Sequence, residues 1–327
     1  MGEGPRRAAE LVELVVAREA TGARIDRFLA GCLPVSRSEV QRWIANGRVT
    51  VDGAVRDASA RLREGERVLV RPEPREATVA LPDESVTFEV LHVDDEIVVV
   101  DKPPGLVVHP ARGHERGTLV NGLLARGLFR RDDWGAGVPD GDVDHAAYVR
   151  PGIVHRLDKG TSGVMVVART PRAREGLKAQ FQAHSIERAY EAIVVGGAEA
   201  QTLSTMHGRH PRDRLRFTTR VSRGKRAVTH VRVLGSLRGA THVECTLQTG
   251  RTHQIRVHLA ESGTPVLADP LYGRPPADPL LRSVAERLGH QALHARVLGF
   301  VHPGSGKPVR FEAPPPADFA EALAALR

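Results

Sequence analysis

A polar, glycine-flanked loop followed by an uninterrupted apolar run is the feature that most constrains the fold of this chain. The loop covers residues 155–163, and the apolar run 164–168 follows it directly. This run is about as long as one buried β-strand needs, and Gly163 marks its start. A shorter apolar pair, Ile153-Val154, precedes the loop. The pattern predicts a loop fixed at both ends by core strands, where a rigid scaffold usually presents chemical groups.

Asp158 is the one acid of this loop. It lies among Arg156, Lys159 and, when that side chain is protonated, a third cation at His155. A carboxylate in such a loop is a candidate nucleophile or base. A second interpretation is that Asp158 only caps a turn, as Asp often does before Gly or Thr. The local sequence leaves both interpretations open, so the rest of the chain has to decide.

Composition indicates a soluble globular protein with room for two domains. The chain has 327 residues, of which 41% are hydrophobic and 26% charged. No apolar run approaches the roughly 20 residues of a membrane span, and the mixed segment 11–17 is too short and too charged for a signal peptide. Cys32 and Cys245 are isolated and offer neither metal spacing nor a disulfide framework. We therefore expect a cytoplasmic protein.

Positive charge is concentrated in one segment. The formal net charge is +8, and residues 201–260 contain twelve Lys and Arg, Arg209 and Lys225 among them, against two acids, Asp213 and Glu244. Focused basicity suits a phosphate-backbone partner better than general solubility, although a solvated arginine-rich face is the alternative. Because only 4% of residues are aromatic, arginine and backbone shape have to do most of the nucleic-acid recognition.

A small module is predicted over residues 22–71. Ile25, Phe28 and Leu29 have helical spacing, and Asp52-Gly53 between apolar pairs is a hairpin signal. Five arginines lie largely outside the apolar stripe and are candidates to line one surface: Arg24, Arg27, Arg37, Arg42 and Arg48. An amphipathic helical hairpin that packs only on its own domain is the alternative. We divide the chain into an N-terminal domain over 1–75, a proline-punctuated linker over 76–87 and a catalytic domain over 88–327.

The second domain alternates predicted strands and helices. Strands are expected at 96–100, 187–195 and 243–247, and a helix at 118–124. Thr170-Pro171 is typical of a helix start. Thr252 is expected to cap a further helix, which leaves Arg251 at a strand-to-helix corner. The histidines have no zinc-ligand spacing, and no phosphate-binding glycine loop occurs, so we expect neither a metal nor a cofactor.

Two resemblances connect these features. Segment 22–71 resembles the S-four RNA-binding domain, through the motifs at 24–29, 36–38, 41–44 and 47–53. Residues 88–312 resemble the RluA-type family of RNA pseudouridine synthases, and the added N-terminal module makes its RluD-like branch the nearest. The motifs that carry this second resemblance are 155–163 (HRLDKGTSG), 188–192 (RAYEA), 208–211 (GRHP), 250–259 (GRTHQIRVHL), 269–273 (DPLYG) and 291–295 (QALHA).

The family resemblance implies an α+β fold, a mixed and mainly antiparallel sheet flanked by helices, with a small α/β N-terminal domain. It also implies residue roles. Asp158 would be the catalytic aspartate and Arg251 its ion-pair partner, and Tyr190 would stack on the target base. Arg156 would enter the RNA where the uridine has flipped out, and Leu293 would line the uracil pocket. The partner would be a ribosomal RNA stem-loop, bound by a monomer.

Two positions depart from the family pattern, Gly160 where Asp is common and His290 where Arg is common. They bear on the target rather than on the reaction. The function that the resemblance implies is isomerisation of uridines in large-subunit ribosomal RNA. The alternatives are a non-catalytic RNA-binding or ribosome-assembly protein with the same fold, and a metal-dependent RNA hydrolase, against which the missing ligand spacing argues.

Overall fold

The computed structural model describes residues 11–33, 35, 37–72, 80–110, 116–128 and 152–327. The chain forms two compact units, 1–77 and 78–327. Residues 76–79 of the predicted linker 76–87, and residues 129–151, lie outside the described residues. Each unit is described by itself.

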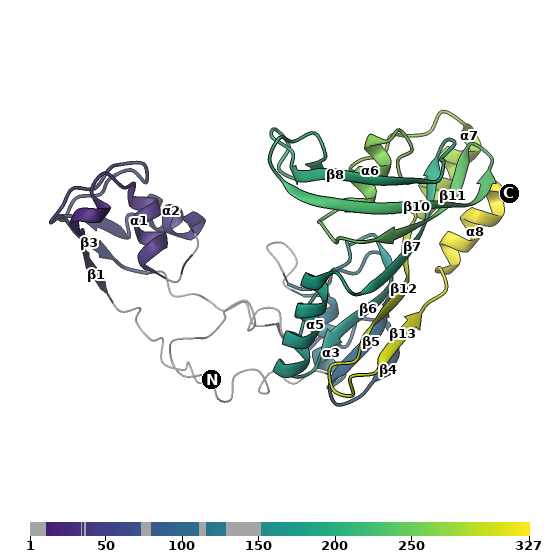
Figure 1. Cartoon of the computed structure of the whole chain (residues 1–327), viewed down its shortest axis with the longest axis horizontal. Coiled ribbons are helices and arrows are strands. Elements are labelled where there is room, and N and C mark those ends of the chain that lie inside the picture. The colour runs from purple at the N-terminus through teal and green to yellow at the C-terminus, as the bar shows by residue number, and fades with distance from the viewer. Residues whose placement is uncertain (1–10, 34, 36, 73–79, 111–115, 129–151) are drawn as a thin grey trace. The chain divides into compact units, whose positions relative to one another are not determined.

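The N-terminal unit packs two helices on a three-stranded sheet. The helices are α1 (Ile25–Cys32) and α2 (Arg37–Ala45) (Figure 1). The strands lie in the spatial order β1 (Val12–Val15), β3 (Arg67–Val70) and β2 (Val49–Val51). A short 3-10 turn (Arg18–Ala20) lies between β1 and α1 in the chain. The hairpin turn forms as predicted, because Asp52 and Gly53 both have positive φ angles, 49° and 81°. Strand β2, however, pairs over its length with β3 rather than with residues 54–55, which contribute a single bridge.

The second unit is built on one ten-stranded sheet, mixed and mainly antiparallel as expected. Its order is β4 (Glu89–Val93), β5 (Ile97–Lys102), β6 (Ser162–Ala168), β12 (Leu293–Val301), β7 (Glu187–Val195), β11 (Ala240–Leu247), β10 (Lys225–Leu237), β8 (Gln201–Arg209) and β9 (Phe217–Thr218). Strand β13 (Pro308–Glu312) pairs with β12. The pairing of β12 with β6 is parallel, and all other strand pairs of this unit are antiparallel.

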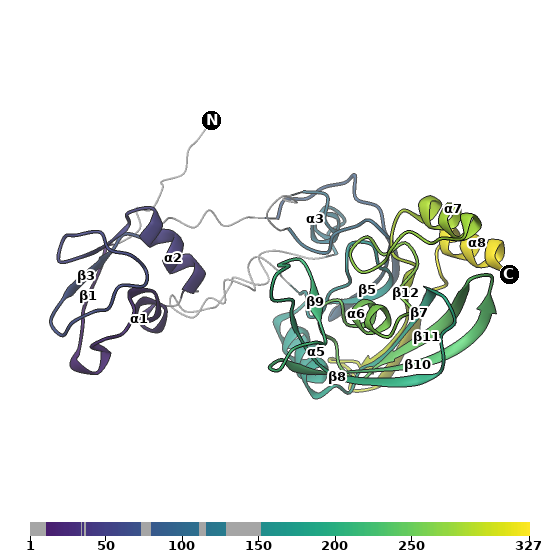
Figure 2. The ribbon, with the colours of Figure 1, turned by 90° about the horizontal axis from the view of Figure 1, so that it is seen from above.

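Among the described residues of this unit, five helices flank the sheet: α3 (Leu119–Ala125), α5 (Pro171–Ala183), α6 (Gln254–Glu261), α7 (Pro279–Leu288) and α8 (Ala317–Leu326). The predicted start of α5 is confirmed, since the Thr170 side chain accepts a hydrogen bond from the backbone N–H of Ala173 and Pro171 opens the helix. In Figure 2, α6 lies on the concave side of the strands β7, β11, β10 and β8. None of the helices in the described ranges is long and apolar enough to cross a membrane.

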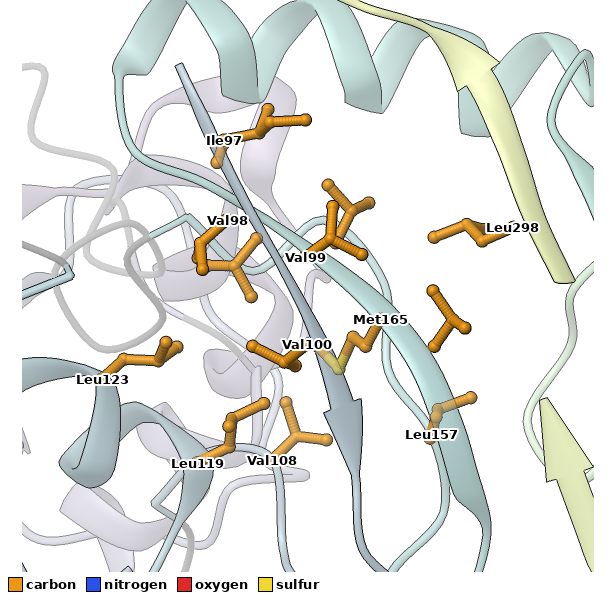
Figure 3. Close-up of a cluster of buried hydrophobic side chains, with 14 of the residues drawn as sticks. Ile97, Val98, Val99, Val100, Val108, Leu119, Leu123, Leu157, Met165 and Leu298 are labelled. Atoms are coloured by element: carbon orange, nitrogen blue, oxygen red, sulfur yellow. The ribbon is translucent and has the colours of Figure 1, made fainter. Parts of the chain in front are cut away.

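Two hydrophobic clusters fill the second unit. In the first, side chains of β5 meet Met165 of β6, with Leu119 and Leu123 of α3 on one side and Leu298 of β12 on the other (Figure 3). The second joins β7 and β11 to α6, α7 and α8. Tyr190 packs against both clusters. The two halves of the sheet therefore meet at β6, β12 and β7, and the segment that carries Asp158 leads directly into β6.

Candidate active site

The loop of residues 155–161 is anchored on β6 at both ends. Ile153 bridges to Val167, and the backbone N–H of Val166 donates to Nε2 of His155 at 3.1 Å. The His155 ring also stacks on Phe181, with ring centres 4.6 Å apart. Burial lowers the pKa of His155 to about 3, helped by the charge of Arg188. His155 is therefore a neutral anchor of the loop, and the conditional cation that the sequence allowed does not form.

Lys102 holds the same loop from the other side. It is fully buried at the end of β5, and its ammonium group donates to the carbonyls of Pro103, Leu106 and Lys159, at 2.8, 2.9 and 3.3 Å. Burial lowers the pKa of Lys102 to about 7, while the charges of Asp158 and Asp101 oppose that shift. Three carbonyl acceptors match the three N–H donors of an ammonium group. Lys102 thus ties the turn after β5 to the residue that follows Asp158.

Asp158 does not use its side chain to close the turn. The backbone carbonyl of Asp158 accepts from the N–H of Thr161 at 3.0 Å. Its carboxylate instead faces Arg256 of α6, whose Nη1 donates to Oδ2 at 2.8 Å. The Asp158 side chain keeps 16% of its surface exposed, so it can meet a substrate. The turn-capping interpretation of Asp158 is therefore wrong.

Arg256 bridges two carboxylates. Its Nε and Nη2 make a bidentate pair with Asp269 at 2.7 and 2.8 Å, and Nη1 reaches Asp158. Burial by itself lowers the pKa of Arg256, but the hydrogen bonds and charges of Asp269 and Asp158 raise it overall. Asp269 is buried, and also accepts from the backbone N–H groups of Leu271 and Tyr272. This chain of contacts fixes the guanidinium that holds Asp158.

The predicted pairing of Arg251 with Asp158 is wrong in this structure. The Nε of Arg251 donates to the backbone carbonyl of Arg226 at 3.1 Å, while Arg256 occupies the place next to the carboxylate. The physical reason is burial. The N-cap of α6 is His253 and not Thr252 as expected, and Arg256 lies in the first turn of this helix, where residues 254–259 are all buried. Arg251 remains in the loop and lines two cavities.

Three cavities meet at Asp158, and Arg156, Asp158 and His253 line all three. The largest has a volume of about 560 Å³ and extends past Tyr190 and Arg188. A second, of about 440 Å³, extends past Gly160 and His290. Tyr190 and Leu293 line the smallest one together with Asp158. Burial raises the pKa of Tyr190, which keeps its phenol neutral. Asp158, Tyr190, Leu293, Arg156 and Arg251 are thus brought together from four separate segments.

The N-terminal arginines fall into different environments. Arg24 and Arg37 both donate to the buried carboxylate of Asp26, at distances from 2.8 to 3.1 Å. Arg27 is exposed on α1, and Arg42 is exposed on α2. Arg48 is half-buried just before β2. Two of the five arginines therefore serve the internal structure of the unit at least in part, and none of the five is shown to bind RNA.

Within the basic segment of the second unit, strands β8, β9 and β10 and their connections form a hairpin next to the site, called the basic hairpin (residues 201–237). Arg209 at the end of β8 lies over the ring of Phe217, 4.9 Å from its centre, and Lys225 opens β10 as an exposed residue. Most other cations of this hairpin are exposed too: Arg212, Arg214, Arg220, Arg223 and Arg226. The hairpin also touches the site, since the backbone N–H of Phe217 donates to the hydroxyl of Tyr272 at 2.9 Å.

Sequence reasoning missed Arg256, Asp269 and Lys102. The available signal for Arg256 and Lys102 was a charged residue next to apolar ones, because such a residue has to find a partner when its segment is buried. Arg256 lies between Ile255 and Val257, and all of residues 254–259 are buried. Lys102 ends an apolar run in the same way. The identity of each partner, by contrast, depends on contacts across the fold.

The fold and the site define a class of RNA-modifying isomerases. The family model of RNA pseudouridylate synthases matches residues 96–261, and the model of the S4 domain matches residues 23–68. The chain belongs to the RNA pseudouridylate synthase family and carries an S4 domain at its N-terminal end. The fold class predicted from the sequence is confirmed.

Relatives match along the whole chain. Ribosomal large subunit pseudouridine synthase D of Xanthomonas campestris is 44% identical over 326 residues, which cover 98% of this chain and 93% of the relative. The protein of the same name from Pseudomonas aeruginosa is 42% identical, covering 100% and 98%. Among solved structures, human RNA Pseudouridylate Synthase Domain Containing 4 has a TM-score of 0.53 and 25% identity, covering 73% of this chain and 92% of that one.

Proposed function

We propose that this enzyme converts uridines of large-subunit ribosomal RNA to pseudouridine, with Asp158 as the catalytic carboxylate. The observation that carries the proposal is the carboxylate of Asp158, which faces three cavities while Arg256 holds one of its oxygens at 2.8 Å. The proposed substrate is the one in the names of the relatives that match along the whole chain, ribosomal large subunit RNA. The S4 domain and the basic hairpin support a structured RNA as the partner.

The reaction rearranges bonds and consumes nothing. The bond between uracil N1 and the sugar C1′ breaks, the base turns, and C5 bonds to C1′. C5 then loses its proton, and N1 ends with one. A carboxylate can serve by attacking C1′ or the uracil ring, or by moving a proton. Arg256 orients the carboxylate of Asp158 for each of these routes. We expect no metal and no cofactor in this reaction.

The other site residues are proposed to bind the flipped nucleotide. A uridine has to leave its stack to reach Asp158, at a cost of a few kcal/mol. Tyr190 offers a neutral aromatic ring for the extruded base, and Leu293 an apolar wall in the same small cavity. Arg156 is exposed and lines all three cavities, so it can occupy the gap in the RNA. Arg251 is proposed to pair with an RNA phosphate and not with Asp158.

RNA outside the site is proposed to contact two basic surfaces. One is formed by the exposed cations of the hairpin, Arg209 and Lys225 included. The other lies on the N-terminal domain and uses Arg27 and Arg42, with Arg24, Arg37 and Arg48 in a supporting or shared role. We keep 1–75, 76–87 and 88–327 as the proposed domain division, and we propose a monomer in the cytoplasm.

The test is pseudouridine mapping of total RNA from cells that lack this protein. Cells complemented with the wild-type chain should regain the missing sites in large-subunit ribosomal RNA, and cells with Asp158→Ala should not. Equal amounts of both proteins, measured by immunoblot, are the control. If Asp158→Ala restores the sites, the carboxylate is not catalytic. If no site changes at all, the alternative of a non-catalytic RNA-binding or ribosome-assembly protein is favoured.

A further inference from the structure

His253 occupies an unusual place between the hairpin and Asp158. It precedes α6 with a φ of 58°, in the left-handed region that His and Asn tolerate better than most residues. Its side chain makes no capping hydrogen bond to the helix within the described part of the chain. The ring stands instead between two polar groups. Nδ1 lies 2.9 Å from the hydroxyl of Tyr272, and Nε2 lies 3.7 Å from Oδ1 of Asp158.

The hydrogen bonds of Tyr272 favour one position for the proton of His253. The backbone N–H of Phe217 can only donate, and it donates to the Tyr272 hydroxyl oxygen at 2.9 Å. The single O–H hydrogen of Tyr272 is then available for Nδ1 of His253. A neutral imidazole whose Nδ1 accepts has its hydrogen on Nε2. That N–H is directed at Asp158.

Burial favours the neutral form of the His253 ring, while the charges around it act in both directions. Burial lowers the pKa of His253, the carboxylate of Asp158 raises it, and Arg256 lowers it again. Asp269 raises this pKa and Arg156 lowers it, both by less. The aromatic rings of Phe217 and Tyr272 meet the imidazole edge-on, both with centres 5.6 Å away. The net direction is downward, so the ring is uncharged at neutral pH and keeps one donor for Asp158.

The two oxygens of Asp158 therefore have different neighbours. Oδ2 is bound by Arg256, and Oδ1 faces the Nε2–H of His253 across a gap slightly too long for a hydrogen bond. Catalytic hydrogen bonds are often long in the free enzyme and shorten when substrate binds. His253 also lines every cavity that reaches Asp158. A small rotation of the carboxylate closes the gap.

We propose that His253 is a positioning residue for Asp158, which donates from Nε2 to Oδ1 when RNA is bound and so fixes the rotation of the carboxylate. Tyr272 acts one step further out, because it holds the proton on the correct nitrogen. This inference rests on the catalytic role proposed above for Asp158. It adds a link from β9, through Phe217 and Tyr272, to the reacting group.

Two substitutions of His253 distinguish the loss of its N–H donor from a change in the structure around it. His253→Asn tolerates the positive φ and retains an acceptor near the Nδ1 position, but its side chain is too short to reach Asp158. His253→Gln places an amide N–H near the Nε2 position. The assay is tritium release from a transcript of large-subunit ribosomal RNA labelled at uridine C5, because C5 loses its proton in the reaction. Thermal unfolding of each variant reports on structure.

We expect His253→Asn to lower kcat about 10- to 100-fold, because a reacting group misplaced by about 1 Å costs on that order, with KM changed less than about threefold. His253→Gln should recover most of that loss. Tyr272→Phe keeps the ring over Arg256 and should lower kcat several-fold, less than additively with His253→Asn.

Three outcomes overturn the proposal. One is a kcat of His253→Asn within about twofold of wild type. Another is an equal loss of kcat in the Asn and Gln variants, which would mean a structural role. The third is an equal loss in the matched control His230→Asn, an exposed histidine of β10.

Asp158→Asn is assayed in parallel. If that variant turns over like the wild type, the proposed catalytic role of Asp158 has failed, which is a separate result from a failure of the inference about His253.

Discussion

Asp26 and Asp158 are two aspartates that bind arginine, one in each unit, and they differ in how completely their oxygens are satisfied. Asp26 has no exposed surface and accepts five hydrogen bonds from Arg24, Arg37 and Gln41. Asp158 is 16% exposed, is bound by Arg256 at Oδ2, and leaves Oδ1 toward the cavities and His253. A carboxylate whose oxygens are all engaged stabilises a fold. One with a spare oxygen beside a cavity can react.

The arginines differ in the same way. Arg24 and Arg37 have side chains 36% and 44% exposed, so water can replace Asp26 around them. Arg256 is 6% exposed and depends on Asp158 and Asp269 for its hydrogen bonds. Burial of the cation makes the pair at the site stiff, because a buried charge without a partner is costly. The site therefore has a rigid cation and a partly accessible anion.

Exchanging Asp for Asn in each unit gives the largest contrast. Asp158→Asn removes the reacting charge, and we expect the rate of tritium release to fall about 10³-fold or more, with little change in unfolding temperature. Asp26→Asn should leave the rate per folded molecule within about twofold and lower the free energy of unfolding of the N-terminal unit by about 1–3 kcal/mol. If both variants lose activity equally, the distinction between the two carboxylates is wrong.

Arg256→Met should affect both rate and stability. The buried carboxylate of Asp269 loses its bidentate partner, and breaking a buried pair from one side costs about 3–5 kcal/mol. Asp158 loses the donor that orients it, so we expect the rate to fall about 10²-fold even in the folded fraction. Arg251→Met, matched in residue type, should cost less than about 1 kcal/mol of stability. Equal destabilisation in both variants would contradict the assignment of Arg256 as the bridging residue.

Acid should destabilise the N-terminal unit through Asp26. The hydrogen bonds from Arg24, Gln41 and Arg37 lower its pKa below the ordinary value, although burial opposes this. A lowered folded-state pKa contributes stability that is complete above the unfolded value of about 3.9 and is lost as pH falls below it. Fluorescence of the buried Trp43, in a Trp134→Phe background that makes it the sole tryptophan, measures this unfolding. Asp26→Asn should flatten the dependence below pH 4, and an unchanged slope would refute the assignment.

The smallest expected effect concerns RNA affinity. Arg27→Ala removes one exposed cation, and we expect modestly weaker binding of ribosomal RNA with a salt slope reduced by about 1. Arg24→Ala should weaken binding as well, but it should also shift the Trp43 unfolding transition, because Arg24 holds Asp26. Filter binding at several salt concentrations measures the slope. A shift of the transition in Arg27→Ala would show that this residue too is structural.

Much of the fold could be predicted because its signals are local. The helix start at Thr170-Pro171, the turn at Asp52-Gly53 and strand β7 over 187–195 were each expected and are present. Short-range propensity and capping decide such elements within a few residues. Local sequence also singled out Asp158, and the family motifs singled out Tyr190 and Leu293, which line one cavity with it. Their proposed roles stay predictions.

What the sequence could not decide was which arginine meets Asp158. Arg251 and Arg256 lie five residues apart in one motif, and both are plausible partners by composition. The choice depends on the start of α6 at Gln254 and on a contact between residues 98 positions apart. Arg256 lies in the buried first turn of α6, while Arg251 stays in the loop before it, so Arg256 is the one that needs a buried partner. Residue identity thus determined which chemical groups the chain possesses, and tertiary packing, through the burial of one helix, determined which of them touch.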